Sequence, residues 1–353
     1  MAYTTVDDGS EYFTTTLYTG NESTNAITNS ANAGDFQPDW VWLKSRNSAT
    51  HHRLYDSSRG ALKNILSSAA NTEATTANSL TSFDSNGFTL GSDDNSNQNT
   101  KTFVAWQWKA NGGTTSSNGD GNITSTVQAN TTAGFSIVLF TGNATAGQTV
   151  GHGLGVKPEI IFAKNRSNGN NWNVYAEPVD NTGNNYLTLN GTVAKESDFN
   201  MWNDTAPTTS LITLGDRNET NGSSHNMVFY CFHSVKGYSK IGSYTGNGNA
   251  DGTFVYTGFK PAWIMLKRTD STNNWNIFDS KRDVDNQVGN VLYANLTSAE
   301  EADASHSSAN DFLSNGFKLR ETGNAVNGSG ATYIYIAFAE HPFVSSKGVP
   351  VTA

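Results

Sequence analysis

The sequence predicts an all-β protein built from three tandem β-sandwich repeats of about a hundred residues each. Short runs of Val, Ile, Thr and aromatic residues, each bounded by Gly, Asn, Pro or Ser, follow one another along the 353 residues, which is the pattern of strands joined by turns. The same runs recur in the same order three times. Helix-like spacing is confined to short stretches such as 58–66, where we expect one or two helical turns.

The repeat is clearest in a segment that passes through a proline. Residues 36–46 reappear at 156–166 and again at 259–268, with apolar residues and then a lysine at matching places. Each copy also closes on an apolar run, at 103–106, 229–232 and 335–338. Several landmarks in one order, three times, indicate a triplicated domain rather than chance similarity.

The repeat divides the chain into four parts. Copy 1 covers 1–112, copy 2 covers 131–236 and copy 3 covers 237–353. Residues 113–130 are rich in Gly, Ser and Asn, a composition typical of a flexible linker or long surface loop. Because only a few residues separate copies 2 and 3, we expect those two to dock closely and copy 1 to be looser.

The strand expected at 40–45 has apolar residues on both faces, because successive side chains of a strand point to opposite sides. Such a strand is predicted to be central and covered on both sides. Cys231 stands where copies 1 and 3 have alanine, which indicates a small buried strand residue rather than a reactive thiol. The repeat core is expected at Trp40, Trp42, Phe162, Trp263, Trp106, Phe232 and Phe338.

Two Asn-Gly pairs predict tight hairpin turns that need a positive φ, at Asn86 and Gly87 and at Asn315 and Gly316. Both pairs lie between strand-like runs at corresponding places of copies 1 and 3.

Composition excludes several classes of protein. The chain has 22 Lys and Arg against 31 Asp and Glu, a net charge of −9, and lacks the basic block that phosphate-backbone binding requires, so we expect no nucleic-acid partner. No apolar run approaches the length of a membrane span and the first residues do not resemble a signal peptide, so we expect no membrane insertion. With one cysteine, no internal disulfide forms, and packing must hold the fold.

No catalytic or metal motif emerges, and we expect no cofactor, no metal and no enzymatic activity. The seven histidines lack metal-ligand spacing, and no nucleophile motif is present. Asp56 and Asp279 recur at one repeat position but become Ala176 in copy 2, so we interpret them as ion pairs with the recurring lysines at a sheet margin rather than as a glycosidase pair. Calcium binding by the oxygen-rich loops at 93–95 and 118–122 stays open.

Two tryptophans lie among polar residues and are candidates for contact with a glycan or a partner protein. Trp202 is followed by Asn203, and Trp108 lies just past the expected closing strand of copy 1. An exposed ring flanked by amides offers both contact area and hydrogen bonds. The alternative is that each ring covers its own sandwich or packs between copies. We expect any recognition surface in the non-repeating loop at 200–209 of copy 2.

Four segments carry a resemblance to a known family. Residues 36–44, 103–110, 237–248 and 333–343 resemble a family of repetitive virion structural proteins from tailed bacteriophages, many of them marine. The resemblance covers nearly all of 1–345. Members are described as tail-fibre or otherwise unassigned virion proteins, with no catalytic residues to carry over.

The resemblance implies a non-enzymatic structural protein of the virion, assembled in the host bacterial cytoplasm. We expect a tail fibre, spike or receptor-binding component whose partners are other virion proteins and a host cell-surface glycan or receptor. A capsid decoration or head-fibre protein is one alternative, and a depolymerase of host polysaccharide is another. The sequence has no heptads and no collagen-like triplets, which departs from an extended fibre shaft. Exposed edge strands favour a homo-oligomer, with a trimer expected.

Overall fold

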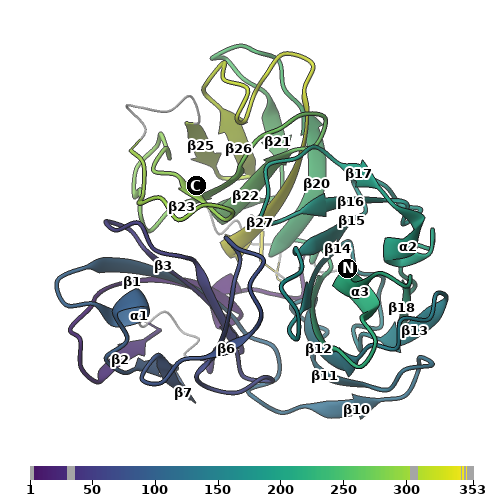
Figure 1. Ribbon diagram of the computed structural model, residues 1–353. Helices are drawn as coiled ribbons and strands as arrows, with labels where there is room; N and C mark the ends of the chain where they lie inside the picture. The colour runs from purple at the N-terminus through teal and green to yellow at the C-terminus, as the bar shows by residue number, and fades with distance from the viewer. Residues whose placement is uncertain (1–3, 30–35, 303–308, 343, 346, 348–353) are drawn as a thin grey trace.

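The computed structural model describes residues 4–29, 36–302, 309–342, 344, 345 and 347. Its regular structure is predominantly strand, so the prediction of an all-β protein is confirmed. Three lobes surround a common centre, and they follow one another along the chain as the colours show (Figure 1). Phe343, which closes the last of the resembling segments, lies outside the described residues, as do the first residues of copy 1 and the last of copy 3.

Copy 1 contains a large and a small antiparallel sheet. The 3-10 turn η1 (Gly9–Glu11) precedes the first strand, and the helix α1 (Asp94–Asn97) precedes the last. The large sheet has, in spatial order, β1 (Phe13–Thr19), β9 (Thr102–Trp108), β3 (Trp40–Ser45), β4 (Arg53–Asp56), β5 (Lys63–Leu66) and β6 (Ala74–Thr75). The small sheet has β2 (Asn25–Thr28), β8 (Gly87–Leu90) and β7 (Leu80–Asp84).

Copy 2 has the same arrangement with two additional strands at one edge. Its short helices are α2 (Phe199–Trp202) and α3 (Asn218–Asn221). The large sheet has β10 (Ser116–Asn118), β11 (Ser125–Asn130), β12 (Phe135–Thr141), β19 (Asn226–Phe232), β14 (Ile160–Asn165), β15 (Asn173–Ala176), β16 (Asn185–Thr188) and β17 (Glu196–Ser197). The small sheet has β13 (Gln148–Gly151) and β18 (Leu211–Leu214).

Copy 3 repeats the order once more. Its large sheet has β20 (Ser239–Thr245), β27 (Thr332–Pro342), β22 (Phe259–Arg268), β23 (Trp275–Asp279) and β24 (Leu292–Tyr293). Its small sheet has β21 (Phe254–Tyr256), β26 (Gly316–Leu319) and β25 (Asn310–Leu313). In all three copies the last long strand lies between the first strand and the strand of the proline segment.

Both predicted hairpins form. Strands β7 and β8 pair from Asp84 to Gly87, and β25 and β26 pair from Leu313 to Gly316. Glycine is required at Gly87, because its φ is 148° and a Cβ there would overlap the carbonyl oxygen of Ile27 on the neighbouring strand. The helical turns predicted at 58–66 are wrong, because 58–62 form turns without a helix and 63–66 form strand β5.

The prediction of a linker at 113–130 is wrong. This segment supplies β10 and β11, and β11 pairs along β12. Its start is held by the buried carboxylate of Asp39, which accepts hydrogen bonds from the backbone amides of Ala110, Gly112 and Gly113 at 2.7–2.8 Å. Burial raises the pKa of Asp39, although these amides and Ser57 act in the opposite direction. Composition alone does not reveal such an anchor, because the acid lies far away in the sequence.

Each large sheet is apolar on both faces, and each face contacts a different cluster. On β3, Val41 and Leu43 belong to an outer cluster that lies between the large and small sheets of copy 1. Copies 2 and 3 have outer clusters of their own. The opposite face of β3 carries Trp40 and Trp42, which belong to one central cluster shared by all three copies. The doubly covered central strand is therefore confirmed.

The seven predicted core positions are all buried, but they do not lie in three separate cores. Trp40, Trp42, Phe162, Trp263, Trp106, Phe232 and Phe338 all belong to the central cluster. Ring centroids are 4.5 Å apart between Trp40 and Tyr230, and 5.7 Å apart between Phe232 and Phe338. Trp108 lies 5.7 Å from Trp263. Rings of copy 1 thus contact both other copies, and the expectation of a looser copy 1 is wrong.

The shared cluster predicts that damage to it affects the whole molecule. Trp108→Ala should lower the free energy of unfolding by about 3–5 kcal/mol, because it opens a cavity in the central cluster. Hydrogen exchange followed by mass spectrometry should show faster exchange in all three copies. Trp202→Ala is the matched variant, because Trp202 belongs to the outer cluster of copy 2 and its effect should stay in that copy. Faster exchange confined to copy 1 in Trp108→Ala would show that the copies are stabilised independently.

Candidate functional site

The structure buries Trp202, so the prediction that this ring is exposed for binding is wrong. Its exposed fraction is 1 %, and its ring centroid lies 6.1 Å from Tyr175 and 5.8 Å from Phe229. Asp198 is the N-cap of α2, and its side chain accepts a hydrogen bond from the amide of Asn200. One turn of helix then directs Trp202 inward and leaves Phe199 54 % exposed.

Trp108 and Asn203 also have structural roles. Trp108 is the last residue of β9 rather than lying past it, and it is 1 % exposed within the central cluster. Asn203 ends α2 in the left-handed conformation, with a φ of 53°, which an asparagine tolerates better than most residues. None of the three predicted contact residues therefore presents an exposed ring, and the alternative that the tryptophans pack inside the protein is correct.

The polar groups around the central cluster form a ring of contacts between copies. Trp172 of copy 2 donates from Nε1 to the carbonyl of Leu66 in copy 1 at 2.7 Å. Trp275 of copy 3 donates to the carbonyl of Thr188 in copy 2 at 2.9 Å. His52 takes the corresponding place in copy 1, where it accepts a hydrogen bond from Trp42 Nε1 at 2.8 Å. Burial lowers the pKa of His52 well below its usual value, so this imidazole is neutral.

The three recurring lysines are buried beside this ring, at 1 % exposure or less. Their ammonium groups do not bind the recurring aspartates, so that interpretation is wrong. Lys164 Nζ donates to the carbonyl of Ala70 in copy 1 at 3.1 Å, and Lys267 Nζ donates to Thr192 in copy 2 at 3.0 Å. Lys44 donates to carbonyls of its own copy. Burial lowers the pKa of each lysine to about 8.

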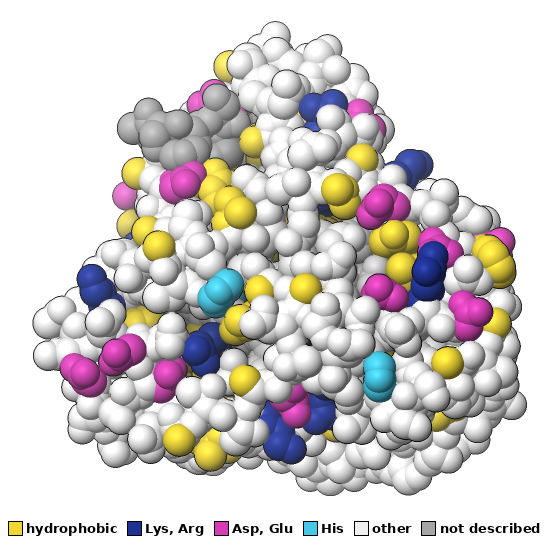
Figure 2. All heavy atoms as spheres, viewed as in Figure 1, with side chains coloured by type: hydrophobic (Ala, Val, Ile, Leu, Met, Phe, Trp, Pro, Cys, Tyr) yellow, Lys and Arg dark blue, Asp and Glu magenta, His cyan; other side chains and the backbone are white. Residues whose placement is uncertain are grey.

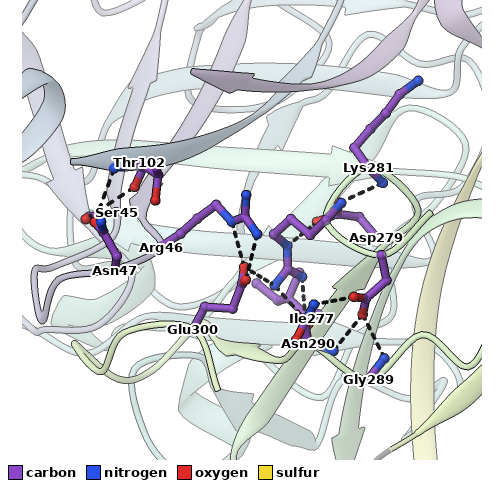
Figure 3. Close-up of polar contacts among 12 residues, drawn as sticks. Ser45, Arg46, Asn47, Thr102, Ile277, Asp279, Lys281, Gly289, Asn290 and Glu300 are labelled. Atoms are coloured by element: carbon purple, nitrogen blue, oxygen red, sulfur yellow. Dashed lines mark hydrogen bonds and ion pairs between the residues drawn. The ribbon is translucent and has the colours of Figure 1, made fainter. Parts of the chain in front are cut away.

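The recurring aspartates belong to two ion networks that join neighbouring copies. Asp56 pairs with Arg59, Arg59 with Glu73 at 3.0 Å, and Glu73 with Arg166 of copy 2 at 2.8 Å. Between copies 3 and 1, Asp279, Arg282, Glu300 and Arg46 form the same chain of contacts (Figure 3). Burial alone would raise the pKa of Glu73 and of Glu300, but their arginine partners outweigh it and hold both pKa values below the usual range.

Aromatic donors complete both networks from the neighbouring copy. The hydroxyl of Tyr230 in copy 2 donates to Asp56 at 2.6 Å. Nε1 of Trp106 in copy 1 donates to Asp279 at 3.0 Å. Strand pairing places these donors at the same position of their sheets, because Tyr230 faces Phe162 and Trp106 faces Trp42.

The remaining contact, between copies 2 and 3, has other residues at the positions of the network. Copy 2 has Ala176 and Val179 where the other copies have aspartate and arginine, and Lys195 where they have glutamate. Each of these three lies at the same place in its sheet, and the amide of Lys195 bonds to Thr269 as that of Glu73 bonds to Arg166. Thr269 stands where copies 1 and 2 have Arg46 and Arg166, so the second arginine of the network is replaced as well. A cavity of about 320 Å³ lies at this contact, with Val179 and Lys195 on one side and Tyr244 and Thr332 on the other.

The buried acids leave little for catalysis. Asp56 and Asp279 are both fully buried and bonded to arginine, so neither reaches a substrate in the surrounding water. Among the described residues, no group of three or more His, Cys, Asp and Glu side chains is placed to hold a metal ion. In the same part of the chain, no helix has the length and apolarity to cross a membrane. Cys231 is buried in β19, as its repeat position predicts.

Exposed aromatic rings occur on β21, at the outer end of copy 3 (Figure 1). Phe254 is 44 % exposed and Tyr256 is 55 % exposed, whereas Val255 between them packs into the outer cluster of copy 3. Both rings therefore lie on the solvent face of the small sheet. An ion pair of Asp251 with Lys318 borders them, because Lys318 faces Phe254 on β26. We call Phe254, Tyr256, Asp251 and Lys318 the β21 surface.

The β21 surface is not among the residues predicted from the sequence, although the sequence contains a signal for it. The run 254–256 alternates aromatic, aliphatic and aromatic residues beside turns rich in Gly and Asn, and the corresponding strand of copy 2, β13, has no aromatic residue. Figure 2 shows a face on which most atoms belong neither to charged nor to hydrophobic side chains, with charges of both signs scattered singly or in small groups.

Comparison with known proteins gives one family. Residues 8–342 match the family described as "Domain of unknown function (DUF7483)", and the chain belongs to it. No curated protein and no solved structure matches the chain.

The buried lysines predict that stability increases with pH above neutrality. Between the folded pKa of about 8 and the ordinary 10.5, the unfolded chain holds more protons than the folded one, so raising the pH favours folding. Urea titrations should show the free energy of unfolding rising by about 1 kcal/mol or more from pH 8 to 9.5. Above that range the buried tyrosines, whose pKa burial raises, oppose the gain.

Lys267→Met should reduce the slope of stability against pH, while Lys260→Met, at an exposed position, should leave the slope unchanged. A flat or falling stability from pH 8 to 9.5 would contradict the prediction.

The copy 2 pattern predicts how the ion networks respond to substitution. Asp56→Ala alone should lower the free energy of unfolding by about 3–5 kcal/mol, because it removes one of the two carboxylates that pair with the buried Arg59 and the acceptor of the Tyr230 hydroxyl. Asp56→Ala combined with Arg59→Val reproduces the pair found at 176 and 179 and should lose less. Denaturant unfolding of both variants, with exposed Asp120→Ala as control, measures the difference. Equal losses in the single and double variants would refute the explanation.

Proposed function

We propose that this chain is a non-enzymatic structural protein of a tailed-bacteriophage virion, acting as a tail fibre, spike or receptor-binding component. We further propose that its copies are three β-sandwich repeats, each a large and a small sheet on either side of an outer cluster. A homo-oligomer, with a trimer favoured, stays a prediction. So do its partners, which are other virion proteins and a host glycan or receptor.

The observation that supports a structural role is the use of the buried charged groups. The carboxylate of Asp39 accepts hydrogen bonds from backbone amides. Asp56 and Asp279 form ion pairs with arginines, and the buried lysines donate to backbone carbonyls. These groups fix copies to one another, and in an enzyme some of them would face a cleft. The resemblance to phage virion proteins then supplies the setting, and the compact three-lobed shape favours a knob or short spike over a long shaft.

Recognition is proposed at the β21 surface instead of the 200–209 loop. Two exposed rings two residues apart on one strand are spaced by about 6.6 Å, which suits contact with successive sugar rings of a host glycan. Copies 1 and 2 lack this ring pair at their equivalent strands, β2 and β13. A binding surface that differs from its sister copies is what a specific function needs on a repeated scaffold.

Immunogold electron microscopy of intact virions tests the virion role. Antibodies against the purified chain should label the tail tip or tail fibres. Label on the capsid would favour the alternative of a decoration or head-fibre protein, and particles without label would refute the proposal. Incubation of the chain with host capsular polysaccharide tests the second alternative, because a depolymerase would shorten the polymer.

The β21 surface predicts a loss of attachment without a loss of stability. Phe254→Ser with Tyr256→Ser should weaken binding of the purified chain to host cells by about thirtyfold, or roughly 2 kcal/mol, because the contact area of both rings is lost. The melting temperature should change little, since both rings are largely exposed. Phe199→Ser, at another exposed ring in copy 2, is the matched control. Binding that is equally strong in the double variant would show that the β21 surface takes no part in attachment.

A further inference from the structure

In copy 2 the extended strand β11 lies in a groove beside β12, and we call this groove the seat of β11. β11 pairs antiparallel with the outer edge of β12, with Thr126 facing Leu139 and Asn130 facing Phe135. One side of the seat is the small sheet, where Ser125 Oγ donates to the carbonyl of Gly151 at 2.7 Å. The other side is copy 1, where the amide side chain of Gln128 hydrogen-bonds with the hydroxyl of Ser57.

Copy 1 has the same three walls. β1 corresponds to β12, because it pairs with β9 as β12 pairs with β19. β2 corresponds to β13, because it pairs with β8 as β13 pairs with β18. Lys281 of copy 3 corresponds to Ser58, the neighbour of Ser57 in the copy 1 wall, since each lies two residues after the recurring aspartate. The seat of β11 thus has a counterpart between copies 3 and 1.

That counterpart is an open groove of about 560 Å³. Its walls are 15–18 of β1, 25–28 of β2 and Lys281, which are the three walls defined above. β1 is the terminal strand of its sheet, and no other described strand pairs with its outer edge. Leu17 of β1 is 38 % exposed there, whereas Leu139 at the same position of copy 2 is half-buried and faces Thr126 of β11.

The outer edge of β1 lacks the features that usually prevent pairing. Its sequence, Phe-Thr-Thr-Thr-Leu-Tyr-Thr, contains no charged residue and no proline, and Thr, Tyr and Phe favour strands. β20, the terminal strand of copy 3, differs, because it carries Lys240 and Gly242 and has Ser243 in place of Leu17. An unprotected edge seven residues long is therefore specific to copy 1 among the described strands of this type.

We propose that this groove binds an extended, uncharged segment of a partner polypeptide, which adds to the large sheet antiparallel to β1. Main-chain hydrogen bonds to the strand edge would supply affinity, as in other cases of strand addition. Thr16, Ala26 and Thr28 line the groove, so Ser, Thr and Val side chains like those of β11 fit it. The walls on both sides of the groove leave room for a single added strand. The edge of another folded sheet would meet these walls and fits less well. This proposal does not rest on the proposed virion function.

A peptide of residues 122–131, which contains β11, is the probe. Labelled with a fluorophore, it is titrated with the full-length chain, and fluorescence anisotropy should show saturable binding at one site. Leu17→Lys should weaken binding at least tenfold, because it places a charge on the groove wall. Ser243→Lys, the matched change on β20, should leave binding unchanged. A peptide methylated at alternate backbone nitrogens should lose at least tenfold, because it cannot form the strand ladder.

Hydrogen exchange locates the bound peptide. New protection should appear in 13–19, and protection in β12 instead would overturn the proposal by showing exchange with the chain's own β11. Absence of saturable binding up to about 1 mM chain, or equal binding of the methylated peptide, would also overturn it. Light scattering tests whether a second copy of this chain occupies the groove. A dimer that Leu17→Lys abolishes would assign the groove to that second copy and overturn the proposal of a partner segment.

Discussion

The central aromatic cluster is the constraint on which the rest of the structure depends. Each large sheet is apolar on both faces, and one small sheet covers only one of them. The inner faces therefore have to be buried against each other, and three sheets meeting at Trp40, Phe232 and Phe338 achieve this. Every lysine, arginine and acid near that centre must then be placed at its margin with a hydrogen-bonding partner, because an unpaired buried charge is strongly unfavourable.

The margin shows two different solutions to that requirement. At two contacts an aspartate, two arginines and a glutamate satisfy one another, with Tyr230 or Trp106 donating from the next copy. At the third, all four members are replaced together, by Ala176, Val179, Lys195 and Thr269. Partial replacement would leave a buried charge without a partner, so these positions are expected to change as a group.

The features that could be predicted from the sequence are those that neighbouring residues determine. The strands, the Asn-Gly hairpins and the burial of residues such as Trp42 follow from alternation and from turn residues. The sequence did not predict that the inner faces share one core, because alternation gives the face of a residue but not its partner. Trp202 has polar neighbours in sequence, yet one helical turn directs it inward, and the start of the segment at 113–130 is held by the distant Asp39. Trp108 had a usable signal, since it follows Trp106 by two positions on the same strand.

The connection of all three lobes in a single chain has a physical consequence. Three separate subunits meeting at such a core would come apart on dilution, whereas here the local concentration of each lobe at the centre is set by the length of the chain that links it to its neighbours. The assembly therefore persists at any protein concentration. The single chain also allows each contact between two copies to have its own residues. A substitution such as that at 176 occurs once in the molecule, whereas in a symmetric trimer it would appear at every interface.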